Sequence, residues 1–353
     1  MDHYMTIDIN LKKEIDLSYQ VIIDPLSQLS FDTKVAVVTN PTVSALHLEY
    51  LTSRINAKEL HIITVPDGEQ YKNWQSIEMI LDGMFEARFN RNSLLIAFGG
   101  GVIGDMTGFA ASIYQRGIDF IQIPTTLLAQ VDASVGGKTG FNNRYGKNLV
   151  GAFHQPKAVY ADASFLKTLP KREFAAGVAE VIKMAVCFDA DFFAWLESAD
   201  LSDEKQLAEA VAKSVRTKAS VVAQDEKERG LRAALNYGHT FGHVIENETD
   251  YTGFLHGEAV AIGMVMANET AVELGWMSRQ EAERVKTLLE RYDLPVSYAI
   301  KDVERFYETF YLDKKSADSA ITFIIPRSLG GVEISDAIDA STIKKVLERY
   351  AVN

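Results

Sequence analysis

The sequence predicts an α/β domain with a parallel sheet, followed by a mostly α-helical domain. Short runs rich in Val, Ile and Ala, such as residues 34–39 and 93–98, alternate with amphipathic segments in the first part of the chain, and this alternation is typical of a parallel sheet. After about residue 161, apolar residues recur at helical spacing instead. A chain of 353 residues is also long for a single core. We therefore expect domains at 1–160 and 161–353, with the functional site in the cleft between them.

The elements expected in the first domain are short strands bounded by turn residues. Residues 34–39 stop at Asn40 and Pro41, and residues 119–123 stop at Pro124, because proline cannot donate a hydrogen bond to a strand ladder. In order, the predicted strands are 4–9, 19–23, 34–39, 60–65, 93–98 and 119–123. Helices are expected between the later strands and end near residues 55, 88 and 114.

The second domain is expected to be built from helices. Apolar residues recur at a period of 3.6 in several segments that lack strand patterns. The predicted helices are 170–188, 204–224, 238–247, 257–274, 278–292 and 341–350. One strand-like run remains, at 320–325. The absence of a low-complexity linker indicates that the two domains pack closely.

Composition and charge exclude several classes of function. The net charge is −12 at pH 7, which disfavours nucleic acid and anionic membranes as partners. The single cysteine, Cys187, excludes an internal disulfide and indicates a reducing compartment. No basic-then-apolar targeting pattern is found at the N-terminus, and the longest apolar run, 259–267, is too short to span a bilayer. These features predict a cytoplasmic protein.

A glycine-rich turn follows the strand at 93–98. Gly99, Gly101 and Gly104 match the GxGxxG pattern, in which glycine lets the backbone approach a pyrophosphate at a helix N-terminus. The turn follows the third or fourth strand rather than the first, and it ends in Asp105, so it departs from the usual dinucleotide fingerprint. A second glycine turn at 135–140 lacks the spacing of an ATP-binding loop, which disfavours ATP.

Three histidines and one glutamate are candidate metal ligands. His239 and His243 are four residues apart, so on a helix they share one face, and His256 starts the next helix. Glu180 and Lys183 are embedded in an apolar helical stretch. The residues alone leave two interpretations open: a buried ion pair beside a polar helix face, or a His/His/Glu site for a divalent metal.

Scattered polar residues suggest a cationic pocket in an otherwise anionic protein. Each of these residues taken alone is better explained by an ordinary structural or solvated role than by function, but together they suit a small polyanion such as a phosphorylated acid. They are Asp132, Lys147, Asn148, Lys218, Arg232 and Asn236.

Several long motifs in this chain resemble the 3-dehydroquinate synthase family, one of the sugar phosphate cyclases, over essentially the full length. In order they are DGEQYK at 67–72, GGGVIGD at 99–105, YQRG at 114–117, PTTLLAQVDASVGGK at 124–138, GKNLVGAFHQP at 146–156, GVAEVIK at 177–183, NYGHTFGH at 236–243, HGE at 256–258 and DKK at 313–315. The resemblance implies a Rossmann-like NAD-binding domain at 1–160, a helical metal- and substrate-binding domain at 161–353, and a homodimer.

The resemblance also implies an activity: a lyase that depends on NAD and on Zn²⁺ or Co²⁺. The implied substrate is 3-deoxy-D-arabino-heptulosonate 7-phosphate, and the products are 3-dehydroquinate and phosphate, in the shikimate route to chorismate and the aromatic amino acids. The implied steps are transient oxidation by NAD, elimination of phosphate, re-reduction and an intramolecular aldol closure.

Site residues follow from the resemblance position by position. The implied metal ligands are Glu180, His239 and His256, so His243 faces the substrate instead of pairing with His239. The NAD site would include Asp67, Gly68, Glu69, Gln70, Tyr71, Lys72, Gly101, Val102, Ile103, Gly104, Asp105, Thr125, Thr126, Lys138, Lys147, Phe165, Leu166, Lys167 and Thr168. The substrate would be held by Asp132, Lys138, Asn148, Lys183, Lys218, Arg232, Asn236 and His243, by Arg116 of the neighbouring subunit, and by Lys314 or Lys315 closing over the pocket. Asn40 stands where some members have Asp, so its adenosine contact is open.

Two other enzyme classes remain as alternatives. A related cyclase could act on another sugar phosphate, although Arg232, Asn236 and His243 together suit a substrate that bears a carboxylate. A metal-dependent polyol dehydrogenase would instead reduce NAD on simple alcohols.

Overall fold

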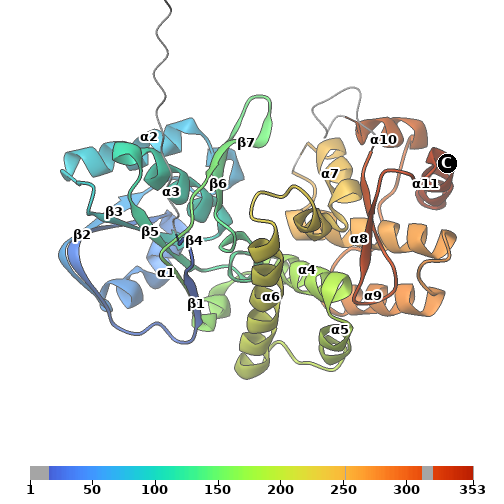
Figure 1. The fold of residues 1–353 in the computed structure, drawn as a ribbon, viewed down its shortest axis with the longest axis horizontal. Coiled ribbons are helices and arrows are strands. Elements are labelled where there is room, and N and C mark those ends of the chain that lie inside the picture. The colour runs from blue at the N-terminus through green and yellow to red at the C-terminus, as the bar shows by residue number, and fades with distance from the viewer. Residues whose placement is uncertain (1–15, 251, 312–320, 353) are drawn as a thin grey trace, which may run out of the picture.

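The computed structural model describes residues 16–250, 252–311 and 321–352. A layered sheet region occupies one side and a group of helices the other, with α4 (Lys171–Phe188) and α6 (Glu204–Gln224) lying between them (Figure 1). The strand predicted at 4–9 and the lysines Lys314 and Lys315 lie outside the described residues.

The sheet region is organised around a six-stranded parallel sheet. In spatial order its strands are β1 (Gln20–Ile23), β8 (Ala158–Ala161), β5 (Asp119–Pro124), β4 (Leu94–Gly99), β2 (Leu29–Thr39) and β3 (Ile55–Thr64). The strands predicted at 19–23, 34–39, 60–65, 93–98 and 119–123 are confirmed. β2 and β3 begin earlier than predicted, because polar residues such as Ser30 and Asn56 continue their pairing.

Alternate residues of the central strands supply two separate cores. Val35 and Val37 of β2 pack with Leu51 on one face, whereas Ala36 and Val38 pack into the core on the other face. The first face is covered by α1 (Pro41–Thr52), and the second by α2 (Trp74–Glu86) and α3 (Gly101–Ile113). Because both faces are covered, the strands read as continuous apolar runs in the sequence.

The largest difference from the predicted elements lies between residues 138 and 153. Instead of a glycine turn and a loop, β6 (Lys138–Asn143) and β7 (Gly146–Phe153) form an antiparallel hairpin, which projects beyond the sheet (Figure 1). Gly140 and Gly151 lie opposite each other, and a Cβ on either would collide with a backbone oxygen of the facing strand. The close approach requires glycine, and glycine hides a strand from a search for β-branched residues.

The helical region contains the helices that the periodicity predicted and two short ones that it did not. In addition to α4 and α6, it contains α5 (Ala190–Leu196), α7 (His239–Glu248), α8 (His256–Glu273), α9 (Arg279–Arg291), α10 (Val303–Thr309) and α11 (Ala340–Leu347), with a small antiparallel pair, β9 (Phe323–Pro326) and β10 (Val332–Ser335). The unpredicted helices α5 and α10 have seven residues each, which is two turns and too short for a clear period. No helix among the described residues is long and apolar enough to cross a membrane.

Glycines set the spacing of the three helices α4, α7 and α8. A Cβ on Gly257 would collide with the carbonyl of Ala176 in α4, and a Cβ on Gly263 would collide with the carbonyl of Gly238, just before α7. These contacts bring the first turn of α8 against α4 and the start of α7 against α8. The candidate metal ligands lie at this junction.

Candidate active site

Glu180, His239 and His256 form a group that could hold a metal ion. Glu180 lies in the middle of α4, and the two histidines are the first residues of α7 and α8. Nε2 of His239 lies 3.7 Å from Oε1 of Glu180, and Nε2 of His256 lies 3.9 Å from the same oxygen. Glu180 is fully buried, and Oε1 accepts no hydrogen bond from any described residue. Two imidazoles and an orphaned buried carboxylate oxygen are the donor set of an open catalytic zinc site, so the residues fit such an ion.

The backbone before α7 orients His239. Gly238 has φ 81°, a left-handed conformation that glycine adopts readily, and Nδ1 of His239 lies 3.1 Å from the carbonyl of Tyr237. This contact leaves Nε2 free to face Glu180. Burial and the charge of Lys183 hold the pKa of His239 well below its usual value. The imidazole is therefore neutral, as a metal ligand must be.

A second group of possible ligands contains His243, Glu246 and His256. Nδ1 of His256 lies 3.4 Å from Oε1 of Glu246. Burial opposes ionisation of Glu246, but the hydrogen bond with His256 and nearby cations lower its pKa to about 2. Neither group contains both His239 and His243, whose rings meet edge-on at 5.6 Å. The geometry therefore groups His239 with His256 rather than with His243 as a candidate ligand.

Two buried lysines lie beside the first group, each next to a carboxylate. Lys183 forms an ion pair with Oε2 of Glu180. Nζ of Lys218 lies 2.5 Å from Oδ1 of Asp132 and 2.6 Å from its carbonyl oxygen, in a π-helical turn at Ala129–Ala133. Burial opposes ionisation of Asp132, yet Lys218 and Lys183 lower its pKa. The buried lysines and carboxylates therefore compensate one another, which lets them stay charged away from solvent.

A second polar cluster surrounds Arg232, which is 1% exposed. Its guanidinium donates to the carbonyls of Glu226 and Gly136, and a Cβ on Gly136 would collide with it. Glu228 pairs with Lys138 and accepts a hydrogen bond of 3.0 Å from Asn236. The sequence interpretation did not include Glu228, which is 90 residues from its lysine partner.

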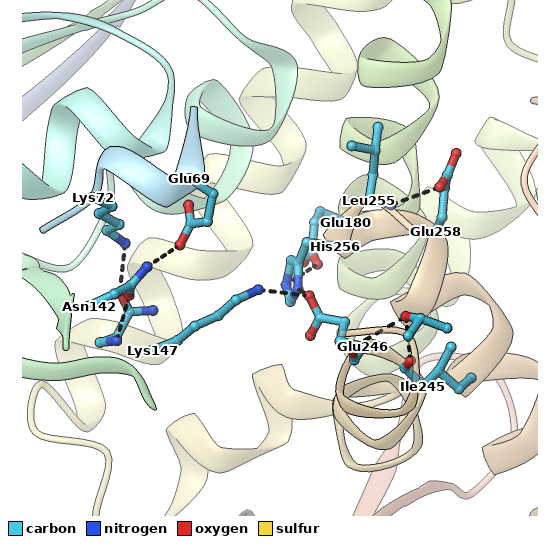
Figure 2. Close-up of polar contacts among 12 residues, drawn as sticks. Glu69, Lys72, Asn142, Lys147, Glu180, Ile245, Glu246, Leu255, His256 and Glu258 are labelled. Carbon is cyan, nitrogen blue, oxygen red and sulfur yellow. Dashed lines mark hydrogen bonds and ion pairs between the residues drawn. The ribbon is translucent and has the colours of Figure 1, made fainter. Parts of the chain in front are cut away.

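Residues around the glycine turn gather at the carboxyl end of β4. Nζ of Lys72 lies 2.6 Å from the carboxylate of Asp105 in α3 and 2.6 Å from Oδ1 of Asn148 in β7. Glu69 accepts a hydrogen bond of 2.7 Å from Asn142 in the same hairpin (Figure 2). The glycine turn, the 3₁₀ turn at Glu69–Tyr71 and the hairpin therefore lie around one space.

The other residues assigned to NAD differ in their surroundings. Asp67 accepts hydrogen bonds from Asn40 (2.8 Å) and Thr42 (2.6 Å) at the ends of β2 and β3. Gly68 has φ 117°, and Gln70 and Tyr71 are exposed. Thr126 lies against Gly100. Four side chains face the core, namely Ile103, Thr125, Phe165 and Leu166. Lys167 pairs with Glu204, and Thr168 contacts His47.

Arg116 lies away from this space. It follows the C-terminus of α3, on the order of 18 Å along the helix from Gly101. Gln115, Arg116 and Gly117 all have positive φ, and Arg116 is exposed. The turn therefore presents Arg116 outward rather than into the pocket of its own chain.

Two family models cover most of the chain. The model described as 3-dehydroquinate synthase N-terminal matches residues 62–176, and the model described as 3-dehydroquinate synthase C-terminal matches residues 177–316. The chain belongs to the 3-dehydroquinate synthase family. Within this family, the 3-dehydroquinate synthase of Sulfurimonas denitrificans is 68% identical over 98% of this chain and 99% of the relative.

Solved structures of related cyclases share the fold. The 2-epi-5-epi-valiolone synthase of Streptomyces hygroscopicus subsp. jinggangensis 5008, with NAD⁺ and Zn²⁺ bound, has a TM-score of 0.87 and 27% identity over 97% of this chain and 99% of its own. A 2-deoxy-scyllo-inosose synthase complexed with carbaglucose-6-phosphate, NAD⁺ and Co²⁺ has a TM-score of 0.79 and 26% identity over 90% of this chain and 91% of its own. The predicted combination of a Rossmann-like domain and a helical domain is confirmed.

Proposed function

We propose that this member of the 3-dehydroquinate synthase family converts 3-deoxy-D-arabino-heptulosonate 7-phosphate to 3-dehydroquinate and phosphate, as a step of the shikimate pathway. The observation that carries the proposal is the group formed by Glu180, His239 and His256, of which the first two are buried. Lys183 lies beside this group, and the Asp132–Lys218 pair lies next to Lys183. A metal-binding group beside paired buried cations suits a substrate that carries hydroxyls, a phosphate and a carboxylate.

The cofactors of the proposal are NAD and a zinc or cobalt ion. When bound, the ion supplies Lewis acidity toward a substrate hydroxyl and NAD supplies a reversible hydride acceptor. Glu180, His239 and His256 would hold the ion. The residues around the glycine turn, with Glu69, Lys72, Asp105 and Lys147 among them, would hold NAD at the N-terminus of α3.

The cationic side chains would bind the ends of the substrate. Lys138 is paired with Glu228, and Arg232 donates to backbone carbonyls. An incoming phosphate or carboxylate would replace these partners and accept charge-assisted hydrogen bonds from both side chains. Asn236 and His243 would orient the hydroxyls. Asp132 would hold Lys218 in its charged form, because the two are within hydrogen-bond distance.

The proposal includes a homodimer in the cytoplasm, in which Arg116 reaches the substrate phosphate of the neighbouring subunit. Arg116 lies in an exposed turn that follows Ile113, which is 39% exposed, and Tyr114, on which the 59% exposed ring of Phe85 packs. Arg116→Ala is expected to lose activity alone and to recover part of it in mixed dimers with Glu180→Gln, since such dimers contain one intact site. Mixed dimers without activity would contradict the shared site.

A coupled assay tests the proposed reaction. Incubation with the heptulosonate phosphate, NAD and Zn²⁺ is expected to release phosphate without accumulation of NADH, and a chelator is expected to stop the release. Stoichiometric NADH would contradict the cyclase and favour a polyol dehydrogenase.

A related cyclase activity is the second candidate, because the two solved neighbours are named for other products. A panel of heptulose and hexose phosphates distinguishes the two. We expect turnover only with the acid-bearing substrate, since Arg232 and Lys138 provide two cationic partners beyond those near the metal group.

A further inference from the structure

Glu246 lies between the metal-binding group and the β6–β7 hairpin. It is 4% exposed, on α7, in the second turn of the helix that begins with His239. One carboxylate oxygen, Oε1, lies 3.4 Å from Nδ1 of His256 and 3.3 Å from Nζ of Lys147 in β7. Figure 2 shows Lys147 extended toward Glu246, with His256 and Glu180 beyond it.

We propose that Glu246 is a positioning residue with two partners: it orients His256 toward the metal, and through Lys147 it ties the β6–β7 hairpin to the metal-bearing helices. The inference rests on the metal site of the proposed function.

The contact with His256 fixes the role of each ring nitrogen. With Nδ1–H donating to Glu246, Nε2 is the nitrogen that lacks a proton, and it is the one 3.9 Å from Oε1 of Glu180. A carboxylate that accepts from a ligating histidine holds the ring in place and makes it a stronger ligand. Tyr237 has the same relation to His239 through a backbone carbonyl, so each histidine ligand has an acceptor behind it.

An alternative is that Glu246 itself binds a metal, together with His243 and His256. The charges argue against it. Glu180 uses different oxygens for its two kinds of partner: Oε2 faces Lys183, and Oε1 faces the histidines. Glu246 instead uses one oxygen, Oε1, for both Lys147 and His256. A cation at Glu246 would lie beside an ammonium group that occupies the same oxygen.

The contact with Lys147 joins two separate parts of the site. Asn148, the next residue, accepts from Lys72, and Lys72 also contacts Asp105 in α3. A continuous series of polar contacts therefore runs from the helix that follows the glycine turn, through the hairpin, to the metal ligand His256. Loss of the central link should loosen the hairpin even where the metal remains bound.

Four variants separate the two contacts. Glu246→Met removes the carboxylate with little change in volume. Glu246→Gln keeps an oxygen that can accept from His256 but removes the charge that pairs with Lys147. Lys147→Met removes the ion pair with Glu246 from the hairpin side, and the proposed role of Lys147 in holding NAD does not enter because the tests below are run without NAD. Glu248→Met is the matched control, because Glu248 lies on the same helix and bonds to Tyr298, not to a histidine.

Metal affinity, measured by competition with a chromogenic chelator for Zn²⁺ in the absence of NAD and substrate, tests the first contact. We expect Glu246→Met to weaken Zn²⁺ binding about 10- to 100-fold, the usual effect of removing the partner of a ligating histidine. The other three variants should change the affinity less than about 3-fold, which is below that range. The visible spectrum of the Co²⁺ form should change in Glu246→Met alone. Unchanged affinity and spectrum would overturn the positioning role.

Hydrogen exchange of residues 138–153 tests the second contact. Faster exchange is expected in Glu246→Gln, Glu246→Met and Lys147→Met, and not in Glu248→Met or in Arg144→Met, a control on the same hairpin. Unchanged exchange in Glu246→Gln and Lys147→Met would overturn the tie, and this arm decides the inference if Glu246→Met does not fold.

The stoichiometry of bound metal separates this inference from its alternatives. One equivalent in the unaltered protein and in Glu246→Gln supports a positioning role. Two equivalents, falling to one in Glu246→Met, would make Glu246 a ligand and overturn the inference. No bound metal in the unaltered protein would instead contradict the proposed function, whatever the variants show.

Discussion

The sheet region and the helical region bring polar groups to the site in different ways. At the carboxyl ends of β2, β3 and β4, the chain presents a glycine turn and exposed side chains such as Asp67 and Glu69, which are hydrogen-bonded to close neighbours in space. In the helical region Glu180, Lys183 and Arg232 are each no more than 1% exposed. A buried charge depends on its partners far more than an exposed one does. Substitutions in the helical region should therefore have larger effects than comparable ones in the sheet region.

The largest effect is expected from Glu180→Gln. The change keeps the shape of the side chain but removes the negative charge shared by the metal group and Lys183. We expect weaker Zn²⁺ binding and a loss of turnover of at least about 10³-fold, since a bound metal supplies several kcal/mol of stabilisation. Metal content and phosphate release measure the two effects. Glu173→Gln, in the first turn of the same helix, is the control, and comparable losses in both variants would show that the effect comes from α4 as a whole.

Gly263→Ala should have the next largest effect, and it tests helix spacing rather than charge. Its Cβ would collide with the carbonyl of Gly238, so α7 and α8 must separate. We expect a loss of about 3 kcal/mol in the free energy of unfolding, at the upper end for overpacked cores, and a weaker metal site because His239 and His256 move apart. Urea unfolding and metal content measure these effects. Gly331→Ala, which meets only an ordinary contact at 3.7 Å, should be close to neutral.

The difference between the sheet region and the helical region also determines which features can be predicted from the sequence. β2, β4 and β5 were found because buried parallel strands read as apolar runs that end at turn residues. The hairpin β6–β7 was missed because Gly140 and Gly151 serve a close approach that no local pattern reports. Helical spacing suggested that His239 pairs with His243, yet the geometry groups His239 with His256, because the packing of α7 on α8 sets that distance. The family resemblance supplied that grouping, and the local pattern did not.

Two carboxylates near the site remained invisible in the sequence for a related reason. Glu228 and Glu246 lie 90 and 99 residues from their lysine partners. In the sequence each is an ordinary polar residue in a helical or turn segment. Only the juxtaposition of the hairpin with the helical region gives them their lysine partners. The family resemblance therefore grouped the candidate metal ligands, and the fold was needed to locate the groups that contact them.

Asp162→Asn should have an intermediate effect and tests the most tightly bonded carboxylate of the sheet region. Asp162 follows β8, and its oxygens accept from the N–H groups of Leu26 and Ser164 and from the hydroxyl of Tyr50, each at 2.8 Å. Asn retains one acceptor oxygen, so we expect a loss of about 2 kcal/mol at neutral pH, the size of a charged hydrogen bond. Zn²⁺ binding should remain, since these bonds hold Leu26, α1 and the 3₁₀ turn at Ala163–Thr168 rather than the metal group.

The pH dependence of this loss has a definite sign. Burial opposes ionisation of Asp162, but its hydrogen bonds, led by Ser164, lower its pKa below the unfolded value. A lowered pKa adds stability above the unfolded pKa of about 3.9, and this contribution is lost as the pH falls through the folded value. Urea unfolding of both proteins should therefore converge below about pH 4. Asp24→Asn, in an exposed turn after β1, is the control, and a difference that grows in acid would contradict the assignment.

The smallest effect is expected from Lys58→Met, on the edge strand β3. Nζ of Lys58 lies 2.9 Å from Oδ1 of Asp32, which is within ion-pair distance, but the two side chains are 62% and 93% exposed. Solvent screens such a pair, so we expect Lys58→Met to change the free energy of unfolding by no more than about 0.5 kcal/mol. Lys183→Met should lower it far more, because the change leaves the buried carboxylate of Glu180 without its cation on α4. Urea unfolding at low and high salt measures both. A loss of more than about 1 kcal/mol in the free energy of unfolding of Lys58→Met would exceed the usual range for exposed pairs. It would contradict the difference between the two regions, because the edge of the sheet would then depend on its charges as well.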